Sequence, residues 1–160
     1  MSKPYYEFFC PVKVIAGHAA LEHVPFELSI LGAQRPLIIT DKGVRGVGLL
    51  THVEAAFAAA GASIAAIFDD VPPDSSLQTV RAAAQVYRDN NCDAIIAIGG
   101  GSVIDTSKAV NILASEGGDD LLGQRHFIFA RHARHDFLRG EQFFGRAFIA
   151  FQQGAFADGM

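Results

Sequence analysis

The stretch from Asp93 to Ala109, DAIIAIGGGSVIDTSKA, constrains the fold of this chain more than any other part. Residues Ala94 to Ile98 are all apolar and include three isoleucines, a pattern typical of a strand that is buried on both faces. Gly99, Gly100 and Gly101 follow at once, and without Cβ atoms they let a ligand approach the backbone closely. The sequence therefore predicts a buried strand that turns sharply into a helix.

The helix after the glycines is predicted to run from Val103, with Ser102 as its N-cap and Asp105 as a capping-box acid. Because the amino end of a helix carries free amides and partial positive charge, strand, turn and helix together predict an anion site, most often for nucleotide phosphates. Two structural alternatives stay open. The glycines can serve as a tight turn alone, and Asp105 can simply pair with Lys108 three residues on.

The rest of residues 1–122 alternates between strand and helix patterns. The predicted strands are Phe8–Val14 (an edge strand interrupted by Pro11), Pro36–Thr40, Ser63–Phe68 and Ile95–Ile98. The predicted helices are Ala19–Leu31 (weak, with Pro25 as a break or turn), Leu49–Ala60 (ended by Gly61), Leu77–Asn90 (capped by Ser75 or Ser76) and Val103–Ser115 (closed by Gly117 and Gly118). This alternation predicts an α/β domain with a parallel, doubly wound sheet.

The longer string D-x-I-I-A-I-G-G-G-S-x-x-D-x-x-K resembles the iron-containing (group III) alcohol dehydrogenase family, which includes glycerol dehydrogenase and dehydroquinate synthase. The resemblance covers residues 1–122 and implies a Rossmann-like domain that binds NAD. It places Gly99, Gly100, Gly101, Ser102 and Val103 around the pyrophosphate. The glycines do not form the G-x-G-x-x-G fingerprint, so the whole string and not the triplet carries the resemblance.

Asp41 ends the PLIIT strand, at the edge of the sheet where ligands gather in open α/β folds. A carboxylate there accepts hydrogen bonds from the adenosine ribose and repels a 2′-phosphate, which favours NAD over NADP. The resemblance implies the same role, since Thr40–Gly43 matches the family's T-D-x-G turn. The alternative is an aspartate that caps the backbone of its own turn.

The loop VPPDSS, residues 71–76, aligns with a family segment that usually reads P-N-P-T. Asp74 thus replaces an asparagine that lies near the nicotinamide ribose in the family. An ionised carboxylate accepts hydrogen bonds but donates none. The resemblance therefore makes Asp74 a candidate cofactor residue with altered chemistry.

Beyond Leu122 the composition changes. Residues 123–160 hold eight of the 13 phenylalanines and five arginines but no lysine, valine or proline. No strand–turn–helix rhythm continues, although Phe143–Phe151 suits either a helix or a strand. The family's next elements, a proline-containing strand and a T-x-x-G-T-G-S-E loop, have no counterpart here. We therefore expect a dinucleotide-binding domain at 1–122 and an atypical tail at 123–160, of the kind that a frameshift produces.

The family's α-helical domain, with an aspartate and three histidines that bind iron or zinc, is expected to be missing from this truncated chain. His126, His132, His135 and Asp136 do not have a known ligand spacing, and neighbouring arginines would repel a cation. No iron or zinc is therefore expected to bind. The composition also predicts no nucleic-acid surface, because basic residues are scattered, and no membrane segment. Two cysteines without metal spacing and no signal peptide favour a cytoplasmic protein.

The leading interpretation is the NAD-binding portion of an iron-type alcohol dehydrogenase, inactive alone. The alternative from another class is a non-enzymatic nucleotide-binding or interaction fragment that self-associates through exposed apolar surface. An unrelated phosphate-binding α/β domain is a third hypothesis. NAD binding separates the first two from the third, and NAD-dependent alcohol oxidation separates the first from the second.

Overall fold

The computed structural model describes residues 15, 20–116 and 147–151 of the chain. In chain order the elements are η1 (Ala20–His23, a 3-10 helix), α1 (Val24–Ile30), β1 (Pro36–Ile39), α2 (Lys42–Gly46), α3 (Leu49–Ala59), β2 (Ala66–Phe68), α4 (Leu77–Asp89), β3 (Ala94–Ile98), α5 (Gly101–Glu116) and β4 (Ala147–Phe151). Strands and helices alternate from β1 to α5, as the sequence predicts.

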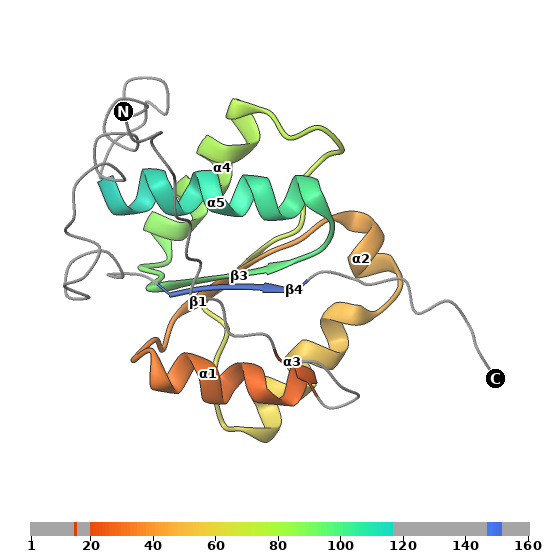
Figure 1. Cartoon of the computed structure of the whole chain (residues 1–160), viewed down its shortest axis with the longest axis vertical. Helices are drawn as coiled ribbons and strands as arrows, with labels where there is room; N and C mark the ends of the chain where they lie inside the picture. Colours follow the sequence, from red (N-terminus) through yellow and green to blue (C-terminus); the bar gives the residue numbers. More distant parts are fainter. Residues whose placement is uncertain (1–14, 16–19, 117–146, 152–160) are drawn as a thin grey trace, which may run out of the picture.

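The four strands form one parallel sheet in the order β2-β1-β3-β4. Ile38 in β1 is in register with Ile67 of β2 on one side and Ile96 of β3 on the other. Figure 1 shows α4 and α5 over one face of the sheet and α1 and α3 over the other. Helices on both faces of a parallel sheet make a doubly wound α/β fold, so the predicted Rossmann-like architecture is confirmed.

The core lies in two layers, one on each face of the sheet, because successive side chains of a strand point to opposite faces. Leu37, Ile39, Ile95 and Ala97 pack with α4 and α5, whereas Ile38, Ala94, Ile96 and Ile98 pack with α1 and α3. Every residue of β1 and β3 is buried. A strand covered on both faces needs apolar residues throughout, which explains the unbroken AIIAI run.

Two predicted helix boundaries are confirmed. Ser76 is the N-cap of α4, where its Oγ accepts a hydrogen bond from the amide of Thr79 at 3.2 Å. Gly61 follows the C-cap of α3 with φ of 66°, the left-handed conformation that glycine adopts most easily at this position.

Three elements differ from the prediction. Residues after Asp41, predicted as a turn, form α2, because the Asp41 side chain caps them. Strand β2 starts at Ala66 instead of Ser63, and the amide of Ala62 still bonds back to the Phe57 carbonyl at the end of α3. The weak first helix forms as η1 followed by α1, with Pro25 in the first turn of α1, where its missing amide proton costs nothing.

Strand β4 comes from the predicted tail. For Phe143–Phe151 the sequence left helix and strand open, and Ala147–Phe151 is a strand paired in parallel with all five residues of β3. The sheet thus includes a strand from beyond Leu122. The predicted edge strand Phe8–Val14, the Gly117–Gly118 helix end and the rest of the tail lie outside the described residues, and the domain boundary at Leu122 stays a prediction.

In the part of the chain that the structure describes, no helix is both long enough and apolar enough to cross a membrane.

Candidate functional site

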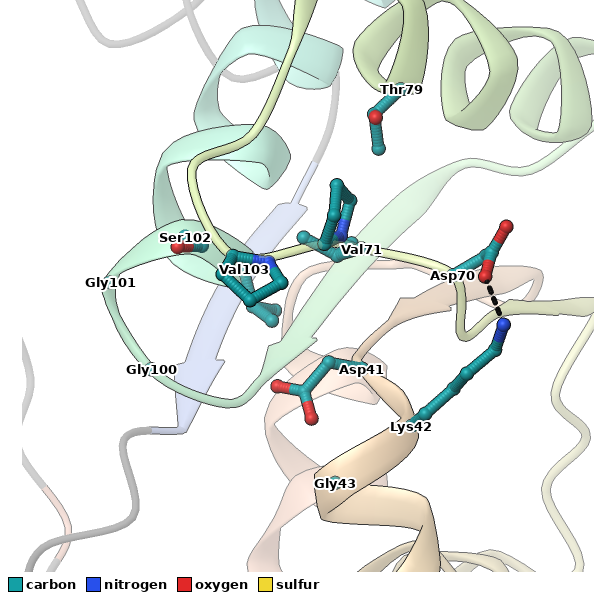
Figure 2. Close-up of a pocket in the computed structure, with 12 residues that line it drawn as sticks. Asp41, Lys42, Gly43, Asp70, Val71, Thr79, Gly100, Gly101, Ser102 and Val103 are labelled. Carbon is teal, nitrogen blue, oxygen red and sulfur yellow. Dashed lines mark ion pairs between the residues drawn. The ribbon is translucent and has the colours of Figure 1, made fainter.

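The strand order creates a topological switch point between β1 and β3. From β1 the chain crosses to β2 on one side, and then continues to β3 on the other side of β1. The connections that leave β1 and β3 therefore diverge, and in open α/β sheets this leaves a ligand-binding crevice at the carboxyl ends of the strands. A cleft of about 710 Å³ opens there (Figure 2). Its lining residues are Asp41, Lys42, Gly43, Asp70, Val71, Pro72, Pro73, Thr79, Gly100, Gly101, Ser102 and Val103.

Asp41 lies at the predicted edge of the sheet, two residues after the end of β1, and its half-buried carboxylate points toward the glycine turn (Figure 2). One carboxylate oxygen, Oδ1, accepts a hydrogen bond from the amide of Val44 at 2.9 Å and so caps α2. The capping alternative is therefore realised in the structure. The other oxygen, Oδ2, lies 3.2 Å from the position that a Cβ atom at Gly99 would take.

The glycine triplet divides into two parts with different physical roles. A Cβ atom on Gly99 would lie 2.6 Å from Cγ2 of Val103, closer than the backbone and side chain can tolerate, so glycine is required for packing. Cβ atoms on Gly100 and Gly101 would meet no atom within 4 Å. These two positions line the cleft, so their missing side chains leave space for a ligand and serve no packing need.

The prediction that Ser102 is the N-cap of the following helix is wrong. Helix α5 begins at Gly101, and its first bond runs from the amide of Ile104 to the carbonyl of Gly100 at 3.1 Å. Gly100, without a side chain to cap with, therefore takes the N-cap position. The amides of Gly101, Ser102 and Val103 precede this first bond and have no partner within the helix. They come at the edge of the cleft, as an anion site requires.

Ser102 and Asp74 meet through a contact that the sequence does not reveal. The backbone amide of Asp74 donates a hydrogen bond to Oγ of Ser102 at 3.3 Å. Asp74 is exposed, adopts φ of 57°, and does not line the cleft. The structure thus brings Asp41 and residues 99–103 together, and it places Asp74 beside them through its backbone. Further along α5, the pairing of Asp105 with Lys108 is confirmed at 3.2 Å, with both side chains exposed.

Two ion pairs at the rim of the cleft join α2 to the end of β2. Nζ of Lys42 lies 2.7 Å from Oδ1 of Asp70, and Arg45 pairs with Asp69. The Asp70 carboxylate raises the pKa of Lys42, first by its hydrogen bond and then by its charge. Sequence reasoning missed Lys42 and Asp70 as lining residues. Their position just after β1 and β2 was the available signal, since both strands end at this edge.

Possible metal ligands have to be considered separately in the described residues and in the rest of the chain. Within residues 15, 20–116 and 147–151, no group of three or more His, Cys, Asp or Glu side chains is arranged to hold a metal ion. His126, His132, His135 and Asp136 lie outside the described residues.

Comparison with known proteins identifies relatives for most of the chain. Residues 11–135 match the family model of iron-containing alcohol dehydrogenase. The chain is 37% identical over 111 residues to the NAD-dependent methanol dehydrogenase of Bacillus methanolicus, which covers 69% of this chain and 29% of that protein. It is 32% identical over 125 residues to the 1,3-propanediol dehydrogenase of Citrobacter freundii, covering 74% of this chain and 31% of the relative.

Comparison with solved structures also finds dehydrogenases of which this chain covers less than a third. A 1,3-propanediol oxidoreductase is 36% identical with a TM-score of 0.62 over 67% of this chain and 28% of that chain. An NADH-dependent butanol dehydrogenase A from Thermotoga maritima is 26% identical with a TM-score of 0.66, over 72% and 29% respectively. The chain thus spans less than a third of the length of each of these relatives.

Proposed function

Since the chain belongs to the iron-containing alcohol dehydrogenase family, we propose that its described residues are the NAD-binding portion of such a dehydrogenase. One observation carries this proposal: the cleft at the switch point is lined by Asp41 after β1 and by Gly100–Val103 at the start of α5. A dinucleotide fits these residues, because the positions of Gly100 and Gly101 are open to a ligand and the first amides of α5 are available as donors. The methanol dehydrogenase of B. methanolicus, by its name, depends on NAD.

Each group in the cleft has a defined task in this proposal. The amides of Gly101, Ser102 and Val103 donate to the pyrophosphate, whose charge the positive end of α5 stabilises. Asp41 accepts hydrogen bonds from the adenosine ribose hydroxyls. Its negative charge would repel the 2′-phosphate of NADP, so NAD is the expected cofactor. The assignment of Asp74 to the nicotinamide ribose stays a prediction.

NAD, when bound, supplies the hydride acceptor for alcohol oxidation. The chain's own contribution is to bind the cofactor and orient it across the carboxyl edge of the sheet. The described residues offer no ligand set for iron or zinc, so their proposed role is limited to the cofactor.

We further propose that the 160-residue chain has no alcohol dehydrogenase turnover by itself. The resemblance assigns the family's metal to an aspartate and three histidines of a helical domain, and these 160 residues offer no positions that match them. The assay is NADH formation with short alcohols and added iron or zinc. Metal-dependent NADH formation above a metal-free control would contradict this proposal.

The direct test of the proposed function is calorimetric titration and thermal shift of the 160-residue chain with NAD, NADP and buffer alone. We expect NAD to bind and to raise the melting temperature, because a ligand that binds the folded state stabilises it by mass action. NADP should bind more weakly. No heat of binding and no thermal shift with millimolar NAD would refute the proposal. We also propose that the protein is cytoplasmic, as its composition leads us to expect.

The alternative, an interaction fragment, is favoured by one surface feature. Phe26 and Ile30 in α1 and Leu31 at its C-cap are large apolar residues with 58%, 61% and 52% of their surfaces exposed. Apolar residues gathered on an exposed surface mark sites of association. Sedimentation of the wild-type chain and of a Phe26→Ser, Ile30→Ser variant tests this. A monomer in both cases rules out self-association through α1.

A further inference from the structure

The loop between β2 and α4 forms one wall of the cleft. Val71, Pro72 and Pro73 from this loop face the cleft together with Gly100 and Gly101 from the glycine turn. The loop does not take its shape from a regular element, and Asp74 adopts a left-handed conformation that a residue other than glycine adopts at a cost. A segment of this kind keeps one shape only where contacts from outside the loop hold it.

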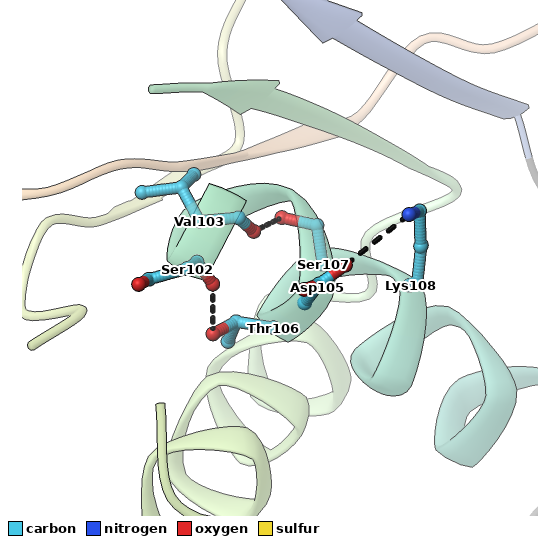
Figure 3. A network of polar contacts seen from close by, with 6 residues as sticks. All are labelled: Ser102, Val103, Asp105, Thr106, Ser107 and Lys108. Carbon is cyan, nitrogen blue, oxygen red and sulfur yellow. Dashed lines mark hydrogen bonds and ion pairs between the residues drawn. The ribbon is translucent and has the colours of Figure 1, made fainter. Parts of the chain in front are cut away.

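The side-chain hydroxyl groups of Thr106 and Ser102, both on α5, supply such contacts. Oγ1 of Thr106, in the second turn of α5, lies 2.5 Å from Oγ of Ser75 in the loop and 2.7 Å from the carbonyl oxygen of Ser102. The second contact between the loop and α5 is the bond from the Asp74 amide to Oγ of Ser102. Figure 3 shows the bond from Thr106 back to Ser102 on α5. The loop is thus joined to the first two turns of α5.

The number of protons on each group decides which hydroxyl donates in the bond between Thr106 and Ser75. A hydroxyl carries one proton, and a carbonyl oxygen can only accept. With Thr106 donating to the Ser102 carbonyl, the proton shared with Ser75 comes from Ser75. Thr106 is buried, with 1% of its surface exposed, and Ser75 is half-buried. Loss of the Thr106 hydroxyl would leave Ser75 without its acceptor.

We propose that Thr106 and Ser75 are positioning residues for the cofactor cleft: their hydrogen bond holds the Val71–Pro73 wall at a fixed distance from the glycine turn. Neither residue lines the cleft, so both act through the loop. This inference rests on the proposed function of the cleft as a dinucleotide site. It adds that part of the affinity for NAD comes from a loop that is already ordered before the cofactor arrives, which lowers the entropic cost of binding.

The test compares Thr106→Val with a matched control, Ser107→Ala, in the 160-residue chain. Ser107 is the next residue on α5 and is equally buried, but its hydroxyl donates at 2.8 Å to the carbonyl of Val103 within the helix (Figure 3). Thr106→Val keeps the side-chain shape and removes the hydroxyl. We expect Thr106→Val to weaken NAD binding by about threefold to tenfold, and Ser107→Ala by less than about twofold.

Amide hydrogen exchange of the loop supplies a readout that a general loss of stability would not give. In Thr106→Val, the amides of Asp74, Ser75 and Ser76 should exchange faster without NAD, while those of β1 and β3 keep the rates of the Ser107→Ala control. Thr106→Ser retains the hydroxyl and should restore both loop protection and NAD affinity. Ser75→Ala should act like Thr106→Val, and the double variant should be no worse than either single one.

Unchanged loop exchange in Thr106→Val overturns the inference, and so does faster loop exchange with NAD affinity equal to that of the control. If the wild-type chain binds no NAD, the proposed function fails. The exchange of the loop amides in the free chain still decides whether Thr106 holds the loop.

Discussion

Replacement of Gly99 by alanine should destabilise the chain, whereas the same change at the adjacent Gly100 should not. At Gly99 the new Cβ atom would lie 2.6 Å and 2.9 Å from Cγ2 and Cβ of Val103. Val103 is 1% exposed and packs in the core between α5 and the sheet, so it cannot turn away. Forcing one extra carbon into such a core costs about 1–3 kcal/mol, which for a chain of this length lowers the melting temperature by about 2–12 °C.

At Gly100 a Cβ atom meets nothing within 4 Å, and the backbone does not have a positive φ. Gly100→Ala should therefore change the free energy of unfolding by less than about 0.5 kcal/mol. Urea unfolding followed by circular dichroism measures both variants. A Gly99→Ala chain as stable as the wild type, or a Gly100→Ala chain destabilised equally, would show that the turn is not packed as described.

The clash can also be relieved in part from the other side, although the Cβ atom of residue 103, at 2.9 Å, remains. Val103→Ala removes Cγ2, the atom nearest to the new Cβ. The loss of stability in the Gly99→Ala, Val103→Ala double variant should thus be smaller than the sum of the two single losses by about 0.5–3 kcal/mol. Additive losses would place the cost of Gly99→Ala elsewhere.

Three further predictions concern the cleft and the core. Gly100→Val should abolish NAD binding with little loss of stability, because its branched side chain fills open cleft space. Calorimetry measures the binding and urea unfolding the stability, and a folded variant that still binds NAD would place the phosphates elsewhere. Asp41→Asn should narrow the difference in binding free energy between NAD and NADP by about 1–3 kcal/mol, since asparagine still caps α2 but lacks the charge. Paired titrations with the two cofactors measure this difference. Equal binding of both cofactors by the wild type would rule out the ribose role. Burial raises the pKa of Cys92 from its ordinary value of 9.0 to about 11, so the unfolded chain loses the thiol proton at a lower pH than the folded chain. The free energy of unfolding should therefore fall as the pH rises from about 9 to 11. The same fall in a Cys92→Ala chain would show that another group causes the pH dependence.

The central part of the fold was predictable because its signals are local. The AIIAI run predicts β3, since an unbroken apolar segment of this length before a turn suits a strand covered on both faces. Ser76 and Gly61 mark helix ends because capping depends on residues within one turn. The parallel arrangement then follows from the alternation of strands and helices.

The errors have non-local causes. Ser102 has the right residue type for an N-cap, but α5 begins two residues earlier than predicted, at Gly101, and Val103 packs closely against Gly99 in the turn before it. The AFIAF segment is too short for periodicity to separate helix from strand, and only its pairing with β3 decides between them. Likewise, Pro72 and Pro73 line the cleft, and their loop is bonded to α5 through Ser75 and Thr106, which are 31 residues apart in the sequence.

Asp41 shows that two interpretations of one residue need not compete. The sequence offered either a cap for the local backbone or a partner for the ribose, and the structure shows the cap. An ionised carboxylate has two oxygens and about four acceptor sites, and the bond to Val44 uses one of them. That bond fixes the side-chain rotamer and leaves Oδ2 on the side of the glycine turn, 3.2 Å from where a Cβ of Gly99 would lie. The cap thus pre-organises the carboxylate for the proposed ligand role. The same bond allows α2 to begin with only two residues between it and the end of β1, because the Asp41 side chain satisfies an amide of the first helical turn.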